Sequence, residues 1–78
     1  MLYYFVAYIS KSGSKASYGS RGVAMTSGKL DVDTVERLIS HDLGGVPVLL
    51  TSISEIPKEI YDSIPAVRQV LVKKPLQL

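Results

Sequence analysis

Cysteine is absent from this sequence of 78 residues, and histidine occurs once, at His41. Without cysteine the chain has neither a disulfide nor a thiolate ligand to reinforce its fold, a composition compatible with a reducing compartment. Long hydrophobic runs are also missing, since the longest spans residues 2–9 and a membrane-spanning helix needs roughly 20 residues. That run lacks the basic leader and cleavage site of a signal peptide. We therefore expect a cytoplasmic protein that opens with a strand.

The length predicts one domain over residues 1–78, with residues 74–78 as a frayed tail. A domain this small buries only roughly 60% of the surface of its unfolded chain. Hydrophobic residues nevertheless make up 46% of the sequence. We therefore expect some apolar surface to remain available for a second copy of the chain or for another partner.

The pattern of apolar segments and breakers predicts an α+β domain with the element order β-β-α-β-α-β. A small mixed or antiparallel sheet should carry an amphipathic helix on one face. Asp31 is suited to cap that helix, and the glycine pair at 44–45 is suited to end it. The polar segment at 11–17 predicts a flexible loop between the first two strands. The expected strands are residues 2–10, 18–26, 46–53 and 67–73, and a short second helix is expected within residues 54–64.

The first strand is apolar on both faces, so its orientation is open. Alternation places Phe5 and Ile9 on one face, and Tyr4, Val6 and Tyr8 on the other. We expect Phe5 and Ile9 to face the core, and Phe5→Ala or Leu38→Ala to cost about 2–5 kcal/mol. The tyrosine face is then either a binding surface or is covered by the second helix or the tail. The expected core is Phe5, Ile9, Val23, Met25, Val35, Leu38, Ile39, Val48 and Leu50.

The sequence contains no constellation typical of catalysis, metal binding or cofactor binding. His41 has no ligand-type residue near it at metal-binding spacing. Ser40, His41 and Asp42 are the residue types of a hydrolytic triad, but consecutive helical residues point in different directions. The SGSKAS and GSRG segments lack the frame of a phosphate-binding loop. Asp31, Asp33 and Glu36 lack the spacing of a cation site, and we expect them to cap the helix. We therefore expect a protein that is not an enzyme and has no cofactor.

Charge is unevenly distributed along the chain, with net values of +4 over residues 1–30, −5 over 31–62 and +3 over 63–78. Cations beside an aromatic residue suit a nucleic acid or an acidic protein surface, although a solvated hairpin is the ordinary alternative. Exposed tyrosines on a sheet stack bases or anchor protein interfaces. The candidate partner-binding residues are accordingly Tyr4, Tyr8, Lys11, Lys15, Tyr18, Arg21 and Lys29.

The YYFVAY segment at residues 3–8, the YGSRG return strand and the helix leading to VPVLLTSI resemble small accessory proteins encoded by phages or prophages. The likeness covers residues 1–53. It implies a compact β-β-α-β protein without catalytic residues, in a bacterial host cell. Such proteins include anti-CRISPR proteins and other inhibitors of host defence. The implied partner is a host protein or ribonucleoprotein complex. Nucleic acid is the second candidate, a homodimer is a further one, and no membrane is expected.

Overall fold

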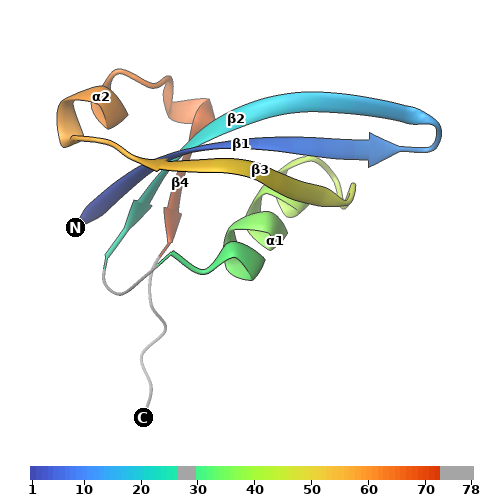
Figure 1. The fold of residues 1–78 in the computed structure, drawn as a ribbon, viewed down its shortest axis with the longest axis horizontal. Helices are drawn as coiled ribbons and strands as arrows, with labels where there is room; N and C mark the ends of the chain where they lie inside the picture. The colour runs from blue at the N-terminus through green and yellow to red at the C-terminus, as the bar shows by residue number, and fades with distance from the viewer. Residues whose placement is uncertain (27–29, 73–78) are drawn as a thin grey trace, which may run out of the picture.

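The computed structural model describes residues 1–26 and 30–72. The predicted α+β class and the predicted order of strands and helices are confirmed (Figure 1). The predicted tail at 74–78 and the turn at 27–29, which includes Lys29, lie outside the described residues. The elements are β1 (Leu2–Ser12), β2 (Lys15–Met25), α1 (Val32–Asp42), β3 (Val48–Glu55), α2 (Lys58–Asp62), the 3₁₀ helix η1 (Ala66–Arg68) and β4 (Gln69–Val72).

The four strands form one mixed sheet in the order β3-β1-β2-β4. β1 runs antiparallel to β2 and to β3, whereas β4 runs parallel to β2. β4 pairs only with the end of β2, from Gly22 to Met25. Among the described residues, no strand therefore pairs with the outer edge of β2 from Lys15 to Arg21. Together with β1, this part of β2 forms a hairpin that extends beyond both edge strands (Figure 1).

The expected loop at 11–17 is wrong, because β1 and β2 stay paired up to Ser12 and Lys15. Only Gly13 and Ser14 connect them, and Gly13 has a φ of 65° while Ser14 has a negative φ. A positive φ at the first of two central residues is the geometry of a type II′ turn, which suits the twist of a hairpin. The segment resembled a loop because its side chains are polar and this end of the hairpin is exposed.

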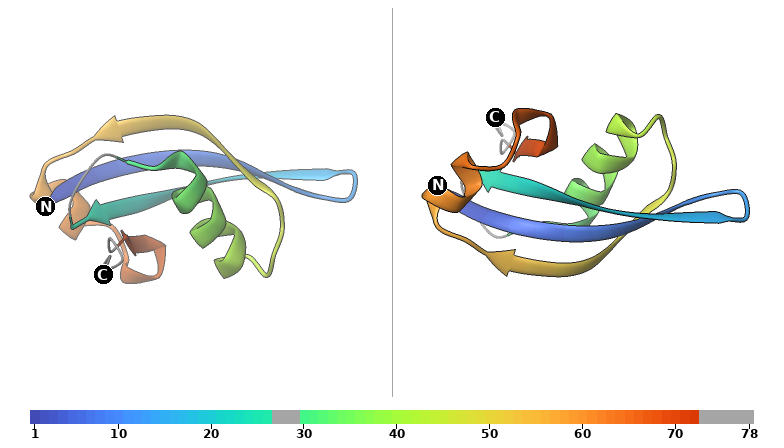
Figure 2. Two further views of the ribbon diagram at one scale, coloured as in Figure 1. Left: turned by 90° about the horizontal axis from the view of Figure 1, so that it is seen from below. Right: turned by 90° about the horizontal axis from the view of Figure 1, so that it is seen from above.

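The two-residue turn also sets which side chains of β1 face the helix. It pairs Tyr4 with Val23, so Tyr4, Val6 and Tyr8 lie on the same face as Val23. α1 packs on this face, which we call the inner face (Figure 2). Val6 is fully buried and Tyr8 is 5% exposed, while Phe5 on the opposite, outer face is 37% exposed. The expected orientation of β1 is therefore inverted.

The hydrophobic core lies between the inner face and α1. The helix contributes Val35 and Ile39, both fully buried. Asp31 caps the helix as predicted, and its carboxylate accepts hydrogen bonds from the Thr34 hydroxyl at 2.7 Å and from the Asp33 amide at 3.2 Å. The hydrogen bond from Thr34 is the largest influence lowering the pKa of the Asp31 carboxyl. The sheet side of the core consists of Val6, Tyr8, Val23, Met25, Val70 and Val72, with Tyr4, Val48 and Leu50 packed at its margin.

α2 covers only one end of the outer face. Tyr61 is buried there, and its ring centroid lies 5.0 Å from that of Tyr3. Gln69 of β4 ties the segment down by donating from Nε2 to the carbonyl oxygens of Tyr61 at 3.2 Å and Ile64 at 2.9 Å. Burial raises the pKa of the Tyr61 hydroxyl. Because α2 stops here, no α-helix among the described residues covers the rest of the outer face.

Two glycines of β2 lie beneath large side chains, and alanine should have different effects at them. A Cβ at Gly19 would meet the ring of Tyr8, including its Cε2 at 2.9 Å, whereas one at Gly22 would meet the terminal Cδ1 of Ile64 at 2.5 Å. The buried ring has little room to move, so Gly19→Ala should lower the free energy of unfolding by about 1–3 kcal/mol. Gly22→Ala should cost less, about 1 kcal/mol, since Ile64 can rotate and the unfolded chain loses entropy, although the Tyr61 ring at 3.2 Å must shift by a few tenths of an ångström. Urea denaturation of both variants checks this, and equal midpoints would contradict it.

Candidate functional site

The predicted site residues divide between the two faces of the sheet. Tyr4 and Tyr8 lie on the inner face under α1, and this corrects their expected place on an open surface. The cause is the register set by the hairpin turn. Lys11, Lys15 and Tyr18 are exposed on the hairpin. Lys29 lies outside the described residues.

Arg21 is held in a structural position. Its Cζ lies 5.2 Å from the centroid of the Tyr8 ring, a cation–π arrangement. Its Nη1 donates to the carbonyl oxygen of Ser20 at 2.9 Å. The Nε atom is buried and has no hydrogen-bond partner among the described residues. The guanidinium therefore covers the edge of β2 and packs on Tyr8.

On the outer face, three side chains form a line that we call the cationic row: Lys11, Tyr18 and Arg68. Tyr18 pairs with Ile9, so it is the diagonal neighbour of Lys11 across the hairpin. Tyr18 is 80% exposed. Ser20 follows two residues later on the same face, and its hydroxyl accepts a hydrogen bond from Nη2 of Arg68. The row thus places an exposed aromatic ring between two cations.

Within residues 1–26 and 30–72, no carboxylate contacts the cations at this end of the molecule. β1 and β2 contain no aspartate or glutamate. Across residues 1–26 and 30–72, the ion pair present joins Lys58 and Asp62 at 2.8 Å within α2. None of the hairpin cations, nor Arg68, therefore contacts a carboxylate in the described chain. The acids lie instead on α1, β3 and α2, so the outer face beside the hairpin is positively charged.

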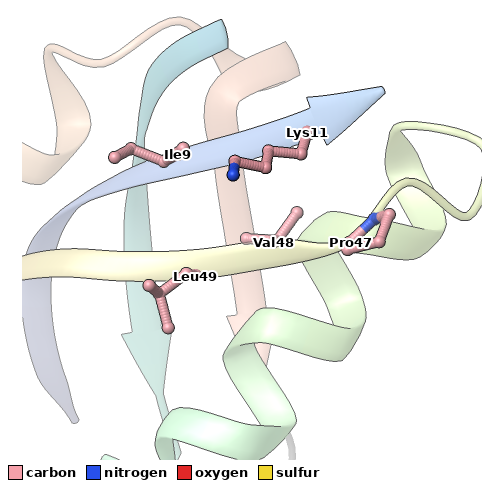
Figure 3. A pocket seen from close by; sticks show the side chains of 5 residues that line it. All are labelled: Ile9, Lys11, Pro47, Val48 and Leu49. Atoms are coloured by element: carbon pink, nitrogen blue, oxygen red, sulfur yellow. The ribbon is translucent and has the colours of Figure 1, made fainter. Parts of the chain in front are cut away.

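An apolar region adjoins the cationic row on the same face. Leu49 of β3, 63% exposed, pairs with the half-buried Ile9 of β1, and Phe5, 37% exposed, lies further along the same face of β1. We call these three residues the bare patch. A groove of about 350 Å³ lies at the Ile9 and Leu49 end of the patch, between β1 and β3, and Lys11 extends back along β1 toward Ile9 (Figure 3). The groove is lined by Ile9, Lys11, Pro47, Val48 and Leu49.

Charged side chains cover part of both sheet edges. Glu36 of α1 accepts a hydrogen bond at Oε2 from the backbone amide of Leu50 at 2.9 Å, on the edge strand β3. Arg21 similarly occupies the carbonyl oxygen of Ser20 on the edge of β2. Charges at sheet edges oppose pairing with strands of other molecules. The bare patch and the cationic row on the sheet face are therefore the better candidates for binding.

The residue types of the hydrolytic triad do not converge. The Ser40 hydroxyl donates to the carbonyl oxygen of Val46 at 2.7 Å, and His41 is exposed at the end of α1. No three His, Cys, Asp or Glu side chains gather to hold a metal ion in residues 1–26 and 30–72. A second hollow, of about 440 Å³, lies between α1 and β3 and is lined in part by Glu36, which is already bonded to Leu50.

Comparisons with protein-family models, curated proteins and solved structures find no match to this chain. Among the described residues, no helix is both long and apolar enough to cross a membrane. The candidate binding surface lies on the outer face and consists of the bare patch, its groove and the cationic row.

Proposed function

We propose that this protein is a non-catalytic protein-binding module that acts by occupying a surface of a host protein complex. The bare patch supports this role, because it exposes large apolar side chains beside a groove in a small domain. Exposed apolar patches rimmed by polar groups are typical of interaction sites. The more specific role, a phage-type inhibitor or regulator of the anti-CRISPR kind, follows from the resemblance of residues 1–53 to phage accessory proteins.

The groove limits the chemistry of the partner. Its lining is apolar except for Lys11, whose ammonium lies near Ile9 (Figure 3). A partner with an apolar side chain next to a carboxylate would fill the groove and neutralise Lys11. Anchors of this kind carry most of the binding energy in many interfaces.

Leu49→Glu should abolish partner capture without unfolding the protein, because Leu49 is largely exposed at the centre of the proposed interface. Tagged protein is incubated with lysate of the bacterial host, and stoichiometric partners are identified by mass spectrometry. The matched control is Val32→Glu, which places the same charge at an exposed apolar position of α1, across the sheet. We expect the control to retain the partner and Leu49→Glu to lose it at least tenfold. Equal capture by both variants would contradict the proposal.

A second copy of the chain is the competing occupant of the bare patch. Light scattering after size exclusion, across a series of protein concentrations, measures this directly. A monomer is the expected result for a protein that keeps this face free for a host complex. A dimer that Leu49→Glu converts to a monomer would assign the patch to self-association and overturn the proposed host partner.

A further inference from the structure

We propose that the cationic row binds single-stranded nucleic acid, with a base stacked on Tyr18 and phosphates held by Lys11 and Arg68. The inference builds on the proposed function in treating the outer face as the binding face. It adds the chemical class of a ligand that the apolar groove alone does not suggest.

Tyr18 offers an unobstructed ring. It is 80% exposed, and its neighbours on the same face of β2, Ala16 and Ser20, are small. A side chain this exposed contributes little to folding through burial. Aromatic rings in such positions serve as stacking platforms for successive bases, because every base has a flat apolar face.

The flanking cations are free to meet phosphates. The partner that the structure gives Arg68 is the neutral hydroxyl of Ser20, and Lys11 contacts no carboxylate among residues 1–26 and 30–72. A phosphate oxygen can displace the hydroxyl and bond the guanidinium with an opposite charge. Lys15 beside the turn alternates to the inner face, so the cations of the row are Lys11 and Arg68. The charge of this surface is therefore complementary to a phosphate backbone.

The position of the ring between the cations favours a single strand over a duplex or an acidic protein. In a duplex the base faces are hidden, so Tyr18 would have nothing to stack on. An acidic polypeptide could satisfy Lys11 and Arg68, but it would gain little from the aromatic ring between them. An unpaired strand, with its bases exposed, uses all three side chains at once.

Fluorescence anisotropy with labelled oligouridine and oligothymidine of about 12 nucleotides tests this inference. The logarithm of the association constant should fall with the logarithm of salt concentration, with a slope near −1.4 for about two phosphate contacts. Tyr18→Ala should weaken binding about tenfold, while Tyr18→Phe should stay within about twofold, since the ring is retained. Lys11→Gln and Arg68→Gln should each flatten the salt slope. The control Lys58→Gln removes a cation of α2 that already pairs with Asp62, and it should change nothing.

Three results would overturn the inference: no binding at low salt, equal affinity for a duplex of the same length, or a Tyr18→Ala variant that binds as well as the parent. Labelled polyglutamate provides the acidic-polypeptide comparison, and binding it as tightly would assign the row to a protein. Circular dichroism confirms that each variant is folded. If Leu49→Glu abolishes capture of a protein from nuclease-treated lysate while oligonucleotides do not bind, this inference fails and the proposed function stands.

Discussion

Ile39→Ala should lower the free energy of unfolding by about 2–5 kcal/mol, whereas Leu38→Ala, one position earlier on α1, should cost about 1 kcal/mol or less. Ile39 is fully buried against the inner face, while Leu38 is 37% exposed. Truncation of Ile39 leaves a cavity that the packed sheet cannot fill. Truncation of Leu38 leaves a depression that water can enter, so the cavity contribution is missing.

Urea denaturation followed by far-ultraviolet circular dichroism measures both changes. A domain of this size has a total stability on the order of 4–12 kcal/mol, so the loss at Ile39 is a large share of the whole. The corresponding drop in Tm should be roughly 10 °C or more. Both variants lie on α1, and both replace a large aliphatic side chain with alanine. Similar losses at both positions would place Leu38 in the core, as the sequence analysis expected, and would contradict the packing of α1.

The helical stripe shows why Leu38 was misplaced. Periodicity groups Val35, Leu38 and Ile39 on one side of α1, but it does not fix the centre of the buried arc. The helix rests with Val35 and Ile39 pointing at the sheet, so Leu38 lies at the margin. Which side of the apolar stripe faces water depends on how α1 packs on the sheet. The local sequence pattern does not carry that information.

Structural features that depend on residues close together in the sequence could be predicted. Asp31 caps α1 because its carboxylate reaches the amide and the hydroxyl of the first turn. The glycine pair after the helix has φ values of 83° and 94°, the left-handed conformation that ends helices. Pro47 precedes β3, and β3 is an edge strand, as a residue without an amide hydrogen requires.

The orientation of β1 could not be predicted because its sequence is apolar on both faces. In such a strand the hydrophobic pattern does not select a register, and a shift of one residue exchanges the faces. The two-residue turn at Gly13 and Ser14 sets the register between β1 and β2. This turn lies within a polar segment that the sequence analysis interprets as a longer loop. Correcting this turn moves Tyr4 and Tyr8 into the core and brings Phe5 to the outer surface.

Only part of the cationic row could be predicted from the sequence. Lys11 and Tyr18 lie on one hairpin, so their proximity followed from the strand pairing. Arg68 was missed because it reaches Ser20 from a position 48 residues later in the chain. It arrives through the parallel pairing of β4 with β2, and the isolated arginine in a VRQV segment carried no local signal of that contact.

Val6→Asp should prevent folding, whereas Phe5→Asp, the adjacent residue on the other face, should leave the protein folded. A carboxylate at the fully buried Val6 would lie among apolar side chains, and Arg21 opposite it would have to leave the Tyr8 ring and the Ser20 carbonyl to pair with it, so the change is expected to cost more than about 4 kcal/mol. At Phe5 the side chain is 37% exposed, so the carboxylate stays in contact with water. The loss there should be roughly 1–2 kcal/mol, from apolar area alone.

Two-dimensional amide NMR spectra of the two variants distinguish the faces directly. Dispersed resonances are expected for Phe5→Asp and collapsed ones for Val6→Asp. The reverse result would mean that odd-numbered residues of β1 face α1. Because Tyr18 pairs with Ile9, it would then turn inward together with Phe5 and Ile9. The residues of the bare patch and of the cationic row on β1 and β2 would then lie under α1 and not on the surface. This one pair of substitutions therefore tests the structural basis of both proposals.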